Sequence, residues 1–459
     1  MPQPKFFQQS MLAPMVSSFS GSLLLPGDDG YETVRRVHNG MIDRHPALIA
    51  RCLGNADVKD SLAFAIDQNL EIAVCGGGHN VAGRAVCDDG IMIDLGLMKG
   101  TWVDPVQKRM RVQAGVTWGE FNRASQLHGL ATTGGAVSST GVAGLTLGGG
   151  FGFLMGKYGY TIDNLKSVEM VSAQGEILLA SSEENPELFW GLRGGGGNFG
   201  IVTSFEFALH EVGPIIQGGM IAHPFSAARD MLNFYREATA DMPDEFTLLG
   251  GLTHARDDSG TPLAAMLACH CGSPEDAAIA VENIKSFGKP VVDHIGSMRY
   301  TDLNQLLDPG VPKLELYYWK ACFVSSLTDD LFDVLIEQFD QCPSNSSKIF
   351  IENFHGAATR LDSSATAFPH RQKGYSILII SQWQDPQYNE QNIEWTRQTY
   401  DSLQPFSREG AYSNYMDDDE SDQRVKSAFG DNFPRLQKLK NQYDPTNLFH
   451  RNQNIPPSI

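Results

Sequence analysis

The order of apolar and polar positions in the first half of the chain predicts short strands that alternate with helices. The predicted strands are the apolar runs at 46–53 ("PALIARCL"), 70–75 ("LEIAVC"), 90–95 ("GIMIDL") and 109–115 ("RMRVQAG"). Apolar side chains recur at helical spacing in 57–68, and 117–129 ("TWGEFNRASQLHG") predicts a helix that ends at Gly129. We therefore expect an α+β domain in this part of the chain.

The pattern changes near residue 212, where glycine becomes less frequent. Strands are predicted at 313–324, 347–358 and 375–383, and a helix at 328–342. These elements predict a second domain built on an antiparallel sheet covered by helices. The tail is again rich in Asn, Asp and Pro, and we expect it to end in irregular backbone. The predicted domains are 1–211, 212–410 and 411–459.

Composition and charge argue against some partners. Of 459 residues, 42% are hydrophobic and 19% are charged, as in an ordinary globular protein of two or more domains. The formal net charge of −19, with no basic patch, argues against nucleic acid or an anionic membrane surface as a partner. Residues 1–21 lack the apolar core of a signal peptide and no apolar run reaches membrane-spanning length, so a cytoplasmic protein is expected.

Cysteines and acidic residues give no indication of a metal site. The seven cysteines are spread along the chain, which fits reduced thiols better than a disulfide framework. The "CHC" at 269–271 is too small a set to hold a metal, and its apolar surroundings predict a buried strand. The acidic run at 417–420 is expected to be a solvated loop.

Three glycine-rich stretches carry the strongest signal for a ligand. They lie at 76–78, 134–152 and 193–200, and the apolar residues among the glycines argue against flexible linkers. Consecutive backbone N–H groups form concave anion sites, so together they suit an extended ligand with a pyrophosphate. The motif Gly195-x-Gly197-x-x-Gly200 follows a predicted helix and precedes a predicted strand, the reverse of a Rossmann loop. We infer a dinucleotide cofactor that is bound without the Rossmann geometry. The spacing of the glycines does not indicate which dinucleotide it is.

Five segments, in this order along the chain, resemble the FAD-linked oxidases of the vanillyl-alcohol oxidase superfamily, in particular the berberine-bridge-enzyme-like family. They are "CGGGHNVAG", "GVAGLTLGGGFG", "ENPELFWGLRGGGGNFGIVTSFEF", "AYSNY" and "YDPTNLFHRNQNIPP". The resemblance runs from about residue 40 to Pro457. It implies a two-lobed PCMH-type FAD-binding domain at 1–211, a substrate domain at 212–410, and a berberine-bridge-type segment at 411–459 that returns to the FAD domain.

The resemblance implies that His79 is bonded through its ring to the 8α carbon of the flavin. Gly76, Gly77, Gly78 and Asn80 would then cradle the pyrophosphate. The alternative is an ordinary loop histidine with no bond. Further cofactor contacts implied by the resemblance are Gly144, Gly148, Asn198, Gly200, Ile201, Val202, Asn414, Asn452 and Asn454.

Many members of that family form a second bond to the flavin through a cysteine. Counting back from Gly148 places this position at Val137, which cannot form a thioether, so a single covalent link is predicted. Val137, Ser138, Ser139, Thr140 and Gly141 would lie along the isoalloxazine. Thr140 falls where family members control oxygen access, and its small side chain favours an oxidase over a dehydrogenase. Alternatively, these hydroxyl groups simply bond a turn.

The "AYSNY" segment matches a family pattern in which Tyr415 takes the position of the base and Tyr412 contacts the substrate. A phenol titrates near ~10, so a base at this position needs a neighbour that lowers its pKa. Ordinary packing is the alternative reading of both tyrosines. Asn353 is a predicted catalytic residue, because some relatives carry a carboxylate there. Glu352 lies on the opposite face of the predicted strand and would substitute only if the register differed.

Candidate walls of the substrate pocket come from a second strand. Tyr317 and Trp319 share one of its faces and Tyr318 lies on the other, although packing within the sheet explains them equally well.

The predicted function is an FAD-dependent oxidase that acts on a small organic alcohol, phenol or amine. A hydride would pass to flavin N5, and O₂ would be reduced to hydrogen peroxide. One alternative is a flavin-dependent oxygenase that tailors a secondary metabolite such as a polyketide, and another is a non-catalytic flavoprotein. The expected partners are a small-molecule substrate and O₂, with no metal, nucleic acid or membrane, and the sequence does not indicate an oligomeric state.

Overall fold

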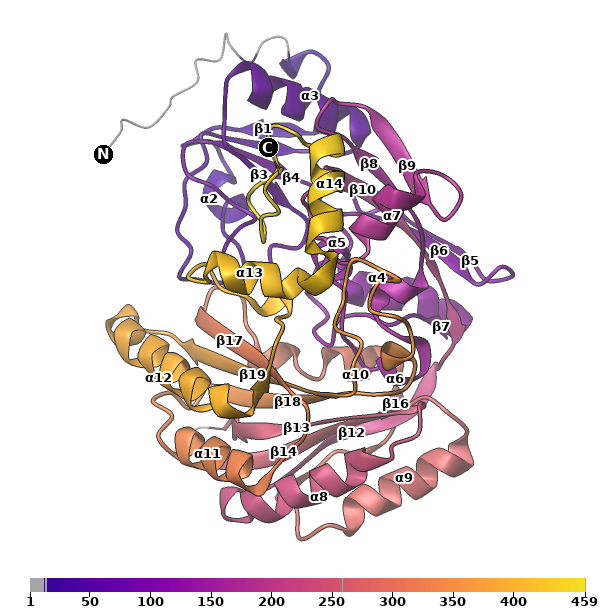
Figure 1. Cartoon of the computed structure of the whole chain (residues 1–459), viewed down its shortest axis with the longest axis vertical. Helices are drawn as coiled ribbons and strands as arrows, with labels where there is room; N and C mark the ends of the chain where they lie inside the picture. The colour runs from indigo at the N-terminus through magenta and orange to yellow at the C-terminus, as the bar shows by residue number, and fades with distance from the viewer. Residues whose placement is uncertain (1–11, 13–14, 258, 459) are drawn as a thin grey trace.

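The computed structural model describes residues 12, 15–257 and 259–458 (Figure 1). Most of the N-terminal stretch in which we predict no signal peptide therefore lies outside the described residues. Within the described residues, no helix combines the length and the apolar character needed to cross a membrane.

The first lobe contains a four-stranded sheet in the order β1-β2-β4-β3. Its strands are β1 (Ser22–Leu24), β2 (Leu48–Arg51), β3 (Ile72–Cys75) and β4 (Ile91–Asp94), and its helices are α2 (Tyr31–Val34) and α3 (Asn55–Asp67). Strands β2, β4 and β3 are parallel. The loop that carries His79 therefore leaves β3 at the carboxyl edge of the parallel strands.

The second lobe contains a five-stranded antiparallel sheet in the order β5-β6-β10-β8-β9. Its strands are β5 (Thr101–Asp104), β6 (Arg109–Gln113), β8 (Leu165–Val171), β9 (Ile177–Ser181) and β10 (Ile201–Ala208). Its helices are α4 (Trp118–Ser125), α5 (Val142–Leu147), α6 (Met155–Tyr158) and α7 (Pro186–Leu192). A two-residue ladder joins β7 (Leu130–Ala131) to β11 (His210–Glu211). One continuous apolar core links both lobes.

A nine-stranded antiparallel sheet forms the lower half of Figure 1. Its strands are β12 (Ile215–Pro224), β13 (Phe246–His254), β14 (Pro262–His270), β15 (Val292–Asp293), β16 (Gly296–Arg299), β17 (Leu316–Val324), β18 (Lys348–Phe354), β19 (Gly374–Trp383) and β20 (Ser407–Arg408). The "CHC" segment ends β14, where Cys269 is buried as predicted. All seven cysteines are free thiols.

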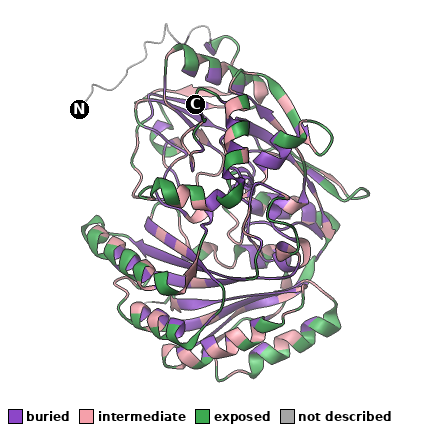
Figure 2. Cartoon of the chain, viewed as in Figure 1, coloured by how far each residue is buried: buried purple, intermediate pink, exposed green. Residues whose placement is uncertain are grey.

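Helices cover the outer face of this sheet, and its inner face is turned toward the two lobes (Figure 1). The outer layer is α8 (Ala228–Ala240), α9 (Pro274–Ser286), α11 (Asp329–Asp340) and α12 (Asn389–Ser402), and α10 (Tyr300–Gln305) contacts α4 of the second lobe. Figure 2 shows buried strands, with exposed residues on the outward side of the helices. The predicted α+β class, with helices on an antiparallel sheet, is confirmed.

The C-terminal segment returns to the lobes and carries α13 (Asp422–Phe429) and α14 (Phe433–Tyr443), which the sequence pattern does not predict. Helix α14 packs on α7. Lys440 fixes the end of the chain, because its buried ammonium donates to Asp444 and to the carbonyls of Asn198 and Phe449. The end of the chain is thereby fastened to the third glycine-rich stretch.

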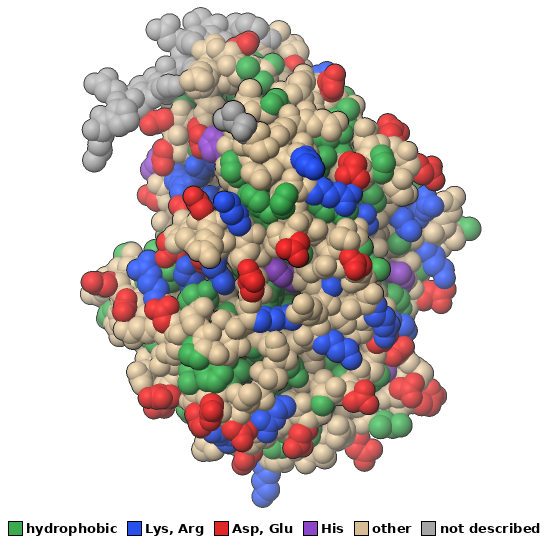
Figure 3. Space-filling model, viewed as in Figure 1, with side chains coloured by type: hydrophobic (Ala, Val, Ile, Leu, Met, Phe, Trp, Pro, Cys, Tyr) green, Lys and Arg blue, Asp and Glu red, His purple; other side chains and the backbone are tan. Residues whose placement is uncertain are grey.

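The prediction of a solvated loop at 417–420 is confirmed only in part: the run is a loop in which Asp418 and Asp419 are exposed, but its first and last residues are not. Asp417 is buried, and the Glu420 side chain is only 8% exposed. Lys320 of β17 pairs with both Asp419 and Glu420, at 2.7 Å each. The acidic run therefore anchors the C-terminal segment to the large sheet. Elsewhere on the face shown in Figure 3, acidic and basic side chains are interspersed.

Candidate active site

A cavity of about 380 Å³ lies among the two lobes, the inner face of the large sheet and the C-terminal segment. This volume falls in the range of enzyme ligand pockets, roughly 300–1,000 Å³. It is lined by all three glycine-rich stretches, by β17, β18 and β19, and by residues 412–415, 449 and 451–453. One cavity therefore joins the segments that the sequence singles out.

The glycine-rich loops touch each other at positions where a side chain would not fit. A Cβ on Gly77 would lie 2.5 Å from the backbone of Gly141, and a Cβ on Gly148 would collide with the side chain of Asn414. Gly144 differs, because a Cβ there would meet nothing within 4 Å and would enter the cavity. Some glycines thus allow the loops to pack, and Gly144 leaves space for a ligand.

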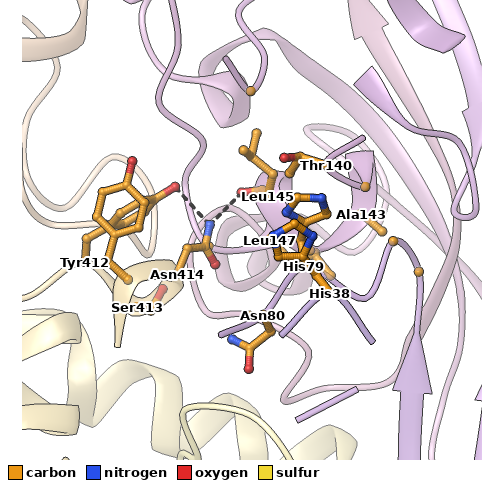
Figure 4. A pocket seen from close by; sticks show the side chains of 18 of the residues that line it. His38, His79, Asn80, Thr140, Ala143, Leu145, Leu147, Tyr412, Ser413 and Asn414 are labelled. Atoms are coloured by element: carbon orange, nitrogen blue, oxygen red, sulfur yellow. Dashed lines mark hydrogen bonds between the residues drawn. The ribbon is translucent and has the colours of Figure 1, made fainter. Parts of the chain in front are cut away.

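His79 lies against His38, with ring centroids 4.0 Å apart and an angle of 20° between the rings (Figure 4). Its Nε2 is 2.8 Å from Oγ of Ser139. Burial, followed by the neighbouring His38 and Lys313, lowers the pKa of His79 well below its ordinary value. Burial lowers the pKa of His38 to about 4. Both rings are therefore neutral near pH 7, and His79 keeps a nitrogen lone pair.

Tyr412 and Asn414 hold the second glycine-rich stretch. The Asn414 side chain donates to the hydroxyl of Tyr412 at 2.9 Å and to the carbonyl of Leu145 at 3.1 Å (Figure 4). The backbone N–H of Gly150 also donates to that hydroxyl, at 3.0 Å, and the ring of Tyr412 stacks on Phe151. Burial raises the pKa of Tyr412 above its ordinary value. The hydroxyl is neutral and accepts two hydrogen bonds.

Tyr415 and Glu352 form a hydrogen-bonded pair in the cavity. The phenol donates to Oε1 of Glu352 at 2.9 Å, and Oε2 has no partner among the described residues. Burial raises the pKa of Glu352 to about 7, against the opposing effects of the hydroxyl groups of Tyr415 and Ser376. Burial and the charge of Glu352 raise the pKa of Tyr415 well above its ordinary value. The carboxylate, not the phenol, is therefore the group that titrates near neutral pH.

The structure corrects the prediction for Asn353. Strand β18 turns Lys348, Phe350 and Glu352 toward the cavity, and Asn353 lies on the other face. There its amide donates to the carbonyl of Thr239, beside a separate polar pocket. Asn353 therefore does not lie in the cavity with Tyr412 and Tyr415, whereas its neighbour Glu352 does.

Most of the other predicted residues line the cavity. They are Gly76, Gly77, Gly78, His79, Asn80, Val137, Thr140, Gly141, Gly144, Gly148, Gly200, Ile201, Val202, Tyr412, Asn414, Tyr415 and Asn452.

Four predicted cofactor contacts are not among the residues that line the cavity. Ser138 bonds the carboxylate of Asp308, and Ser139 bonds His79. Asn198 donates to the carbonyls of Gly195 and Gln453 and accepts from the N–H of Ile455, so it ties the glycine stretch to the tail. Asn454 is next to the lining residue Gln453, and its buried Oδ1 has no partner among the described residues.

Sequence reasoning missed several polar residues of the cavity. His38, Arg256 and Lys348 come from segments without a motif, and no spacing connects them to the glycine-rich stretches. Trp319 lines the cavity, whereas Tyr317 packs beside it and Tyr318 bonds Asp419 on the opposite face. The alternation along β17 gives the correct grouping, and only the sheet shows which group faces inward.

Two family models match the chain. Residues 46–181 match the family described as an FAD binding domain, and residues 411–456 match the family described as berberine and berberine like. The first covers the His79 loop and the second glycine-rich stretch. The second covers Tyr412, Asn414 and Tyr415.

Curated relatives align over nearly the whole chain. An FAD-linked oxidoreductase of Dictyostelium discoideum is 30% identical over 445 residues, which cover 96% of this chain and 95% of the relative. The (R)-6-hydroxynicotine oxidase of Paenarthrobacter nicotinovorans is 29% identical over 464 residues, 96% of this chain and 97% of the relative.

Solved structures share the fold. 6-Hydroxy-D-nicotine oxidase from Arthrobacter nicotinovorans superposes with a TM-score of 0.87 at 27% identity, over 96% of this chain and 99% of that one. A berberine bridge enzyme variant superposes with a TM-score of 0.86 at 21% identity, over 97% and 99% of the two chains. The two-lobed PCMH-type architecture with a large antiparallel sheet is thus confirmed.

Proposed function

Because the chain belongs to the berberine-bridge-enzyme-like family of FAD-linked oxidoreductases, we propose that it is an oxidase with one covalent histidyl link to FAD. Its substrate is a small organic alcohol, phenol or amine. The observation that carries the catalytic part is the Glu352–Tyr415 pair, which places a carboxylate with a pKa of about 7 in the cavity. We also propose 1–211, 212–410 and 411–459 as its FAD-binding, substrate and C-terminal domains.

The lining residues fit FAD. A Cβ at Gly144 would meet nothing within 4 Å and one at Gly197 only the Asn452 amide at 4.0 Å, so a flat ring or a diphosphate can approach the backbone there. Asn452 and Gln453 line the cavity with buried amide oxygens that have no partner among the described residues, as expected where a ligand supplies the donors. A bound flavin supplies the electron acceptor.

His79 is the proposed attachment residue. When Nε2 donates its hydrogen to Ser139, Nδ1 presents a lone pair, and no described residue bonds this nitrogen. The low pKa of His79 keeps the ring neutral, which a nucleophile requires. Val137 stands where relatives place a second, cysteinyl link, and the described cysteines do not line the cavity. One covalent bond is therefore the proposal.

Glu352 is the proposed general base. Oε1 is fixed by Tyr415 while Oε2 remains available to take a substrate proton, and a pKa near the working pH suits proton transfer. Tyr415 holds the carboxylate as a hydrogen-bond donor. This assignment replaces the sequence-based one, in which Tyr415 is the base.

The oxidase assignment is supported by two observations. Thr140 lines the cavity at the position where relatives control oxygen access, and the relative from P. nicotinovorans is named an oxidase of hydroxynicotine. Several fungal relatives, among them one from Aspergillus terreus, are named only FAD-linked oxidoreductases. The oxygenase alternative therefore needs its own test.

The test is a screen of alcohols, phenols and cyclic amines with the purified holoenzyme. An oxidase releases one hydrogen peroxide per product and is reoxidised rapidly in air after anaerobic reduction by substrate. Incorporation of ¹⁸O₂ into the product, with less than stoichiometric peroxide, identifies an oxygenase. Slow reoxidation in air, with rapid reoxidation by an artificial acceptor, identifies a dehydrogenase and rules out the oxidase.

A further inference from the structure

The end of the cavity remote from Glu352 contains two basic side chains that the proposed chemistry does not use. Lys348 lies on the same face of β18 as Glu352, four residues earlier, which corresponds to about 13 Å along the strand. Arg256 lies in the loop between β13 and β14 and also lines the cavity.

Lys348 and Arg256 meet at Gly310. The ammonium of Lys348 donates to the carbonyl of Gly310 at 2.5 Å and to Oε1 of Gln382 at 2.7 Å. The guanidinium of Arg256 lies over the α carbon of Gly310, where any Cβ would collide with it. Both basic side chains therefore lie next to Gly310, and their positive charges are close together.

In this arrangement, both cationic side chains keep N–H groups that have no hydrogen-bond acceptor in the part of the chain that the structure describes. Lys348 is 4% exposed, and its third N–H has no acceptor among the described residues. Arg256 makes no hydrogen bond or ion pair to any described residue, although burial lowers its pKa. Lys348 is buried, and a buried charge is normally paired because an uncompensated one is costly, whereas Arg256 is an exposed residue that is free to turn its donors toward a ligand. Two neighbouring cations with free donors therefore suit an anion that arrives with the ligand.

The wall between the two ends is apolar. Phe350 stands between Lys348 and Glu352 on β18, and Leu378 and Ile380 of β19 lie beside it in the lining. These residues offer a ligand no hydrogen-bonding side chains over the middle of the cavity. The cavity is thus basic at one end, apolar in the middle and carboxylic at the other.

We propose that Lys348 and Arg256 bind a carboxylate of the substrate, and that the substrate is an organic acid whose apolar body separates this carboxylate from the oxidised carbon. The proposal rests on the proposed function, because it takes the carbon to be oxidised beside Glu352. It differs from a structural role for Lys348, in which the ammonium only fastens the loop at Gly310 to β18.

The experiment is isothermal titration calorimetry of the holoenzyme with 6-phenylhexanoate and with its neutral primary amide. These probes have the same length and apolar body and differ in charge at one end. We expect the acid to bind at least about tenfold more tightly at pH 6.5, since hydrogen bonds to charged groups contribute more than neutral ones. Equal affinities for acid and amide would overturn the proposal.

The variants Lys348→Met and Arg256→Met identify the residues responsible. Each is expected to reduce the preference for the acid to about threefold or less. If Lys348→Met does not fold, Arg256→Met still decides, because Arg256 is an exposed residue with no hydrogen bond or ion pair to another described residue. A preference that survives in the folded variants places the carboxylate elsewhere and rejects this assignment. A purely structural role would weaken acid and amide alike.

The pH dependence supplies a second readout. Burial, with repulsion from Arg256, lowers the pKa of Lys348 to about 7, so acid binding should weaken as pH rises from 6 to 8.5. The groups facing Lys348 are Arg256, His38, His254 and Glu315. Glu352 titrates in the same range, so the profile is measured with Glu352→Gln as background. There, a flat profile would contradict the proposal, and Lys348→Met should remove the slope.

The binding measurements involve no turnover, so the two proposals fail separately. A holoenzyme that prefers the acid but never reduces its flavin with any acid would contradict the proposed function and leave the carboxylate site standing. A holoenzyme that oxidises neutral substrates but shows no preference for the acid would support the proposed function and contradict the carboxylate site.

Discussion

Tyr415 donates its phenolic hydrogen to Oε1 of Glu352 across 2.9 Å and so joins the C-terminal segment to the large sheet. A carboxylate held at one oxygen keeps its orientation while the other oxygen exchanges a proton. The same hydrogen bond stabilises the ionised form of Glu352 and keeps the phenol neutral. The pair therefore acts as one unit, with Glu352 as the group that changes its charge.

The first prediction concerns Glu352→Gln, which should lower kcat by about 10²–10⁴-fold because general-base catalysis is lost. In the wild type, kcat/KM should rise as pH passes through about 7, since only the carboxylate accepts a proton. This limb should disappear in the variant. Asn353→Ala is the matched control on the opposite face of β18 and should keep kcat within about twofold. If Asn353→Ala loses activity while Glu352→Gln remains active, Asn353 is the catalytic residue of β18, as the sequence predicts.

The second prediction concerns Tyr415→Phe. Without the hydrogen bond that favours the carboxylate, the pKa of Glu352 should rise, so the limb of the pH profile should move above about 7. The variant should lose activity at pH 7 and recover most of it near pH 9. Steady-state kinetics from pH 6 to 9.5 measures the shift. Activity that stays low at every pH would identify Tyr415 itself as the proton acceptor.

The third prediction tests the attachment of the cofactor. Acid precipitation of the wild type should leave a yellow pellet, and the peptide that contains His79 should carry the flavin by mass spectrometry. His79→Ala should release all flavin to the supernatant, because no described cysteine lines the cavity to form another link. Exposed His128 provides the control variant, His128→Ala, which should keep the yellow pellet. Flavin in the wild-type supernatant would contradict the covalent link.

The sequence predicts His79 and the glycine-rich stretches because their chemistry is local, whereas Glu352 depends on tertiary structure. Alternation along β18 groups Glu352 with Phe350 and separates it from Asn353. The alternation does not show which of the two faces of β18 is turned toward the cavity. That depends on the pairing of β18 with β13 and β19 and on the helices that cover the outer face of the sheet. The low exposure of Glu420 is not predicted for the same reason, since its partner Lys320 lies 100 residues away along the chain.

The fourth prediction separates folding from cofactor binding. Gly144→Ala adds a methyl group that meets no atom outside its own helix and chain neighbours within 4 Å, so melting of the apoprotein should change little while FAD content falls. Gly77→Ala forces a methyl group against the backbone of Gly141 and should destabilise the fold itself. The ratio of flavin to protein absorbance and thermal melting measure both effects. Full FAD content in Gly144→Ala would show that the cofactor does not pass this residue.

The fifth prediction concerns the anchor at Asp419. Although burial opposes its ionisation, hydrogen bonds from Lys320, Tyr318 and Arg397 lower the pKa of Asp419 to about 2. Asp419→Asn should reduce the free energy of unfolding by roughly 1–2 kcal/mol, the lower part of the range for charged hydrogen bonds, because the carboxylate is partly exposed. Denaturant unfolding at pH 7 measures the loss.

The sign of the pH dependence distinguishes this anchor from a general effect of the mutation. The pKa of Asp419 is lower in the folded than in the unfolded chain, where it is about 3.9, so its contribution is present above about pH 4 and is lost as pH falls toward 2. Wild type and Asp419→Asn should therefore converge in stability below pH 4. Asp431→Asn, an exposed change in the same segment, should match the wild type throughout. A stability difference as large at pH 2.5 as at pH 7 would mean that the charge of Asp419 does not hold the C-terminal segment, and with it Tyr415, against the sheet.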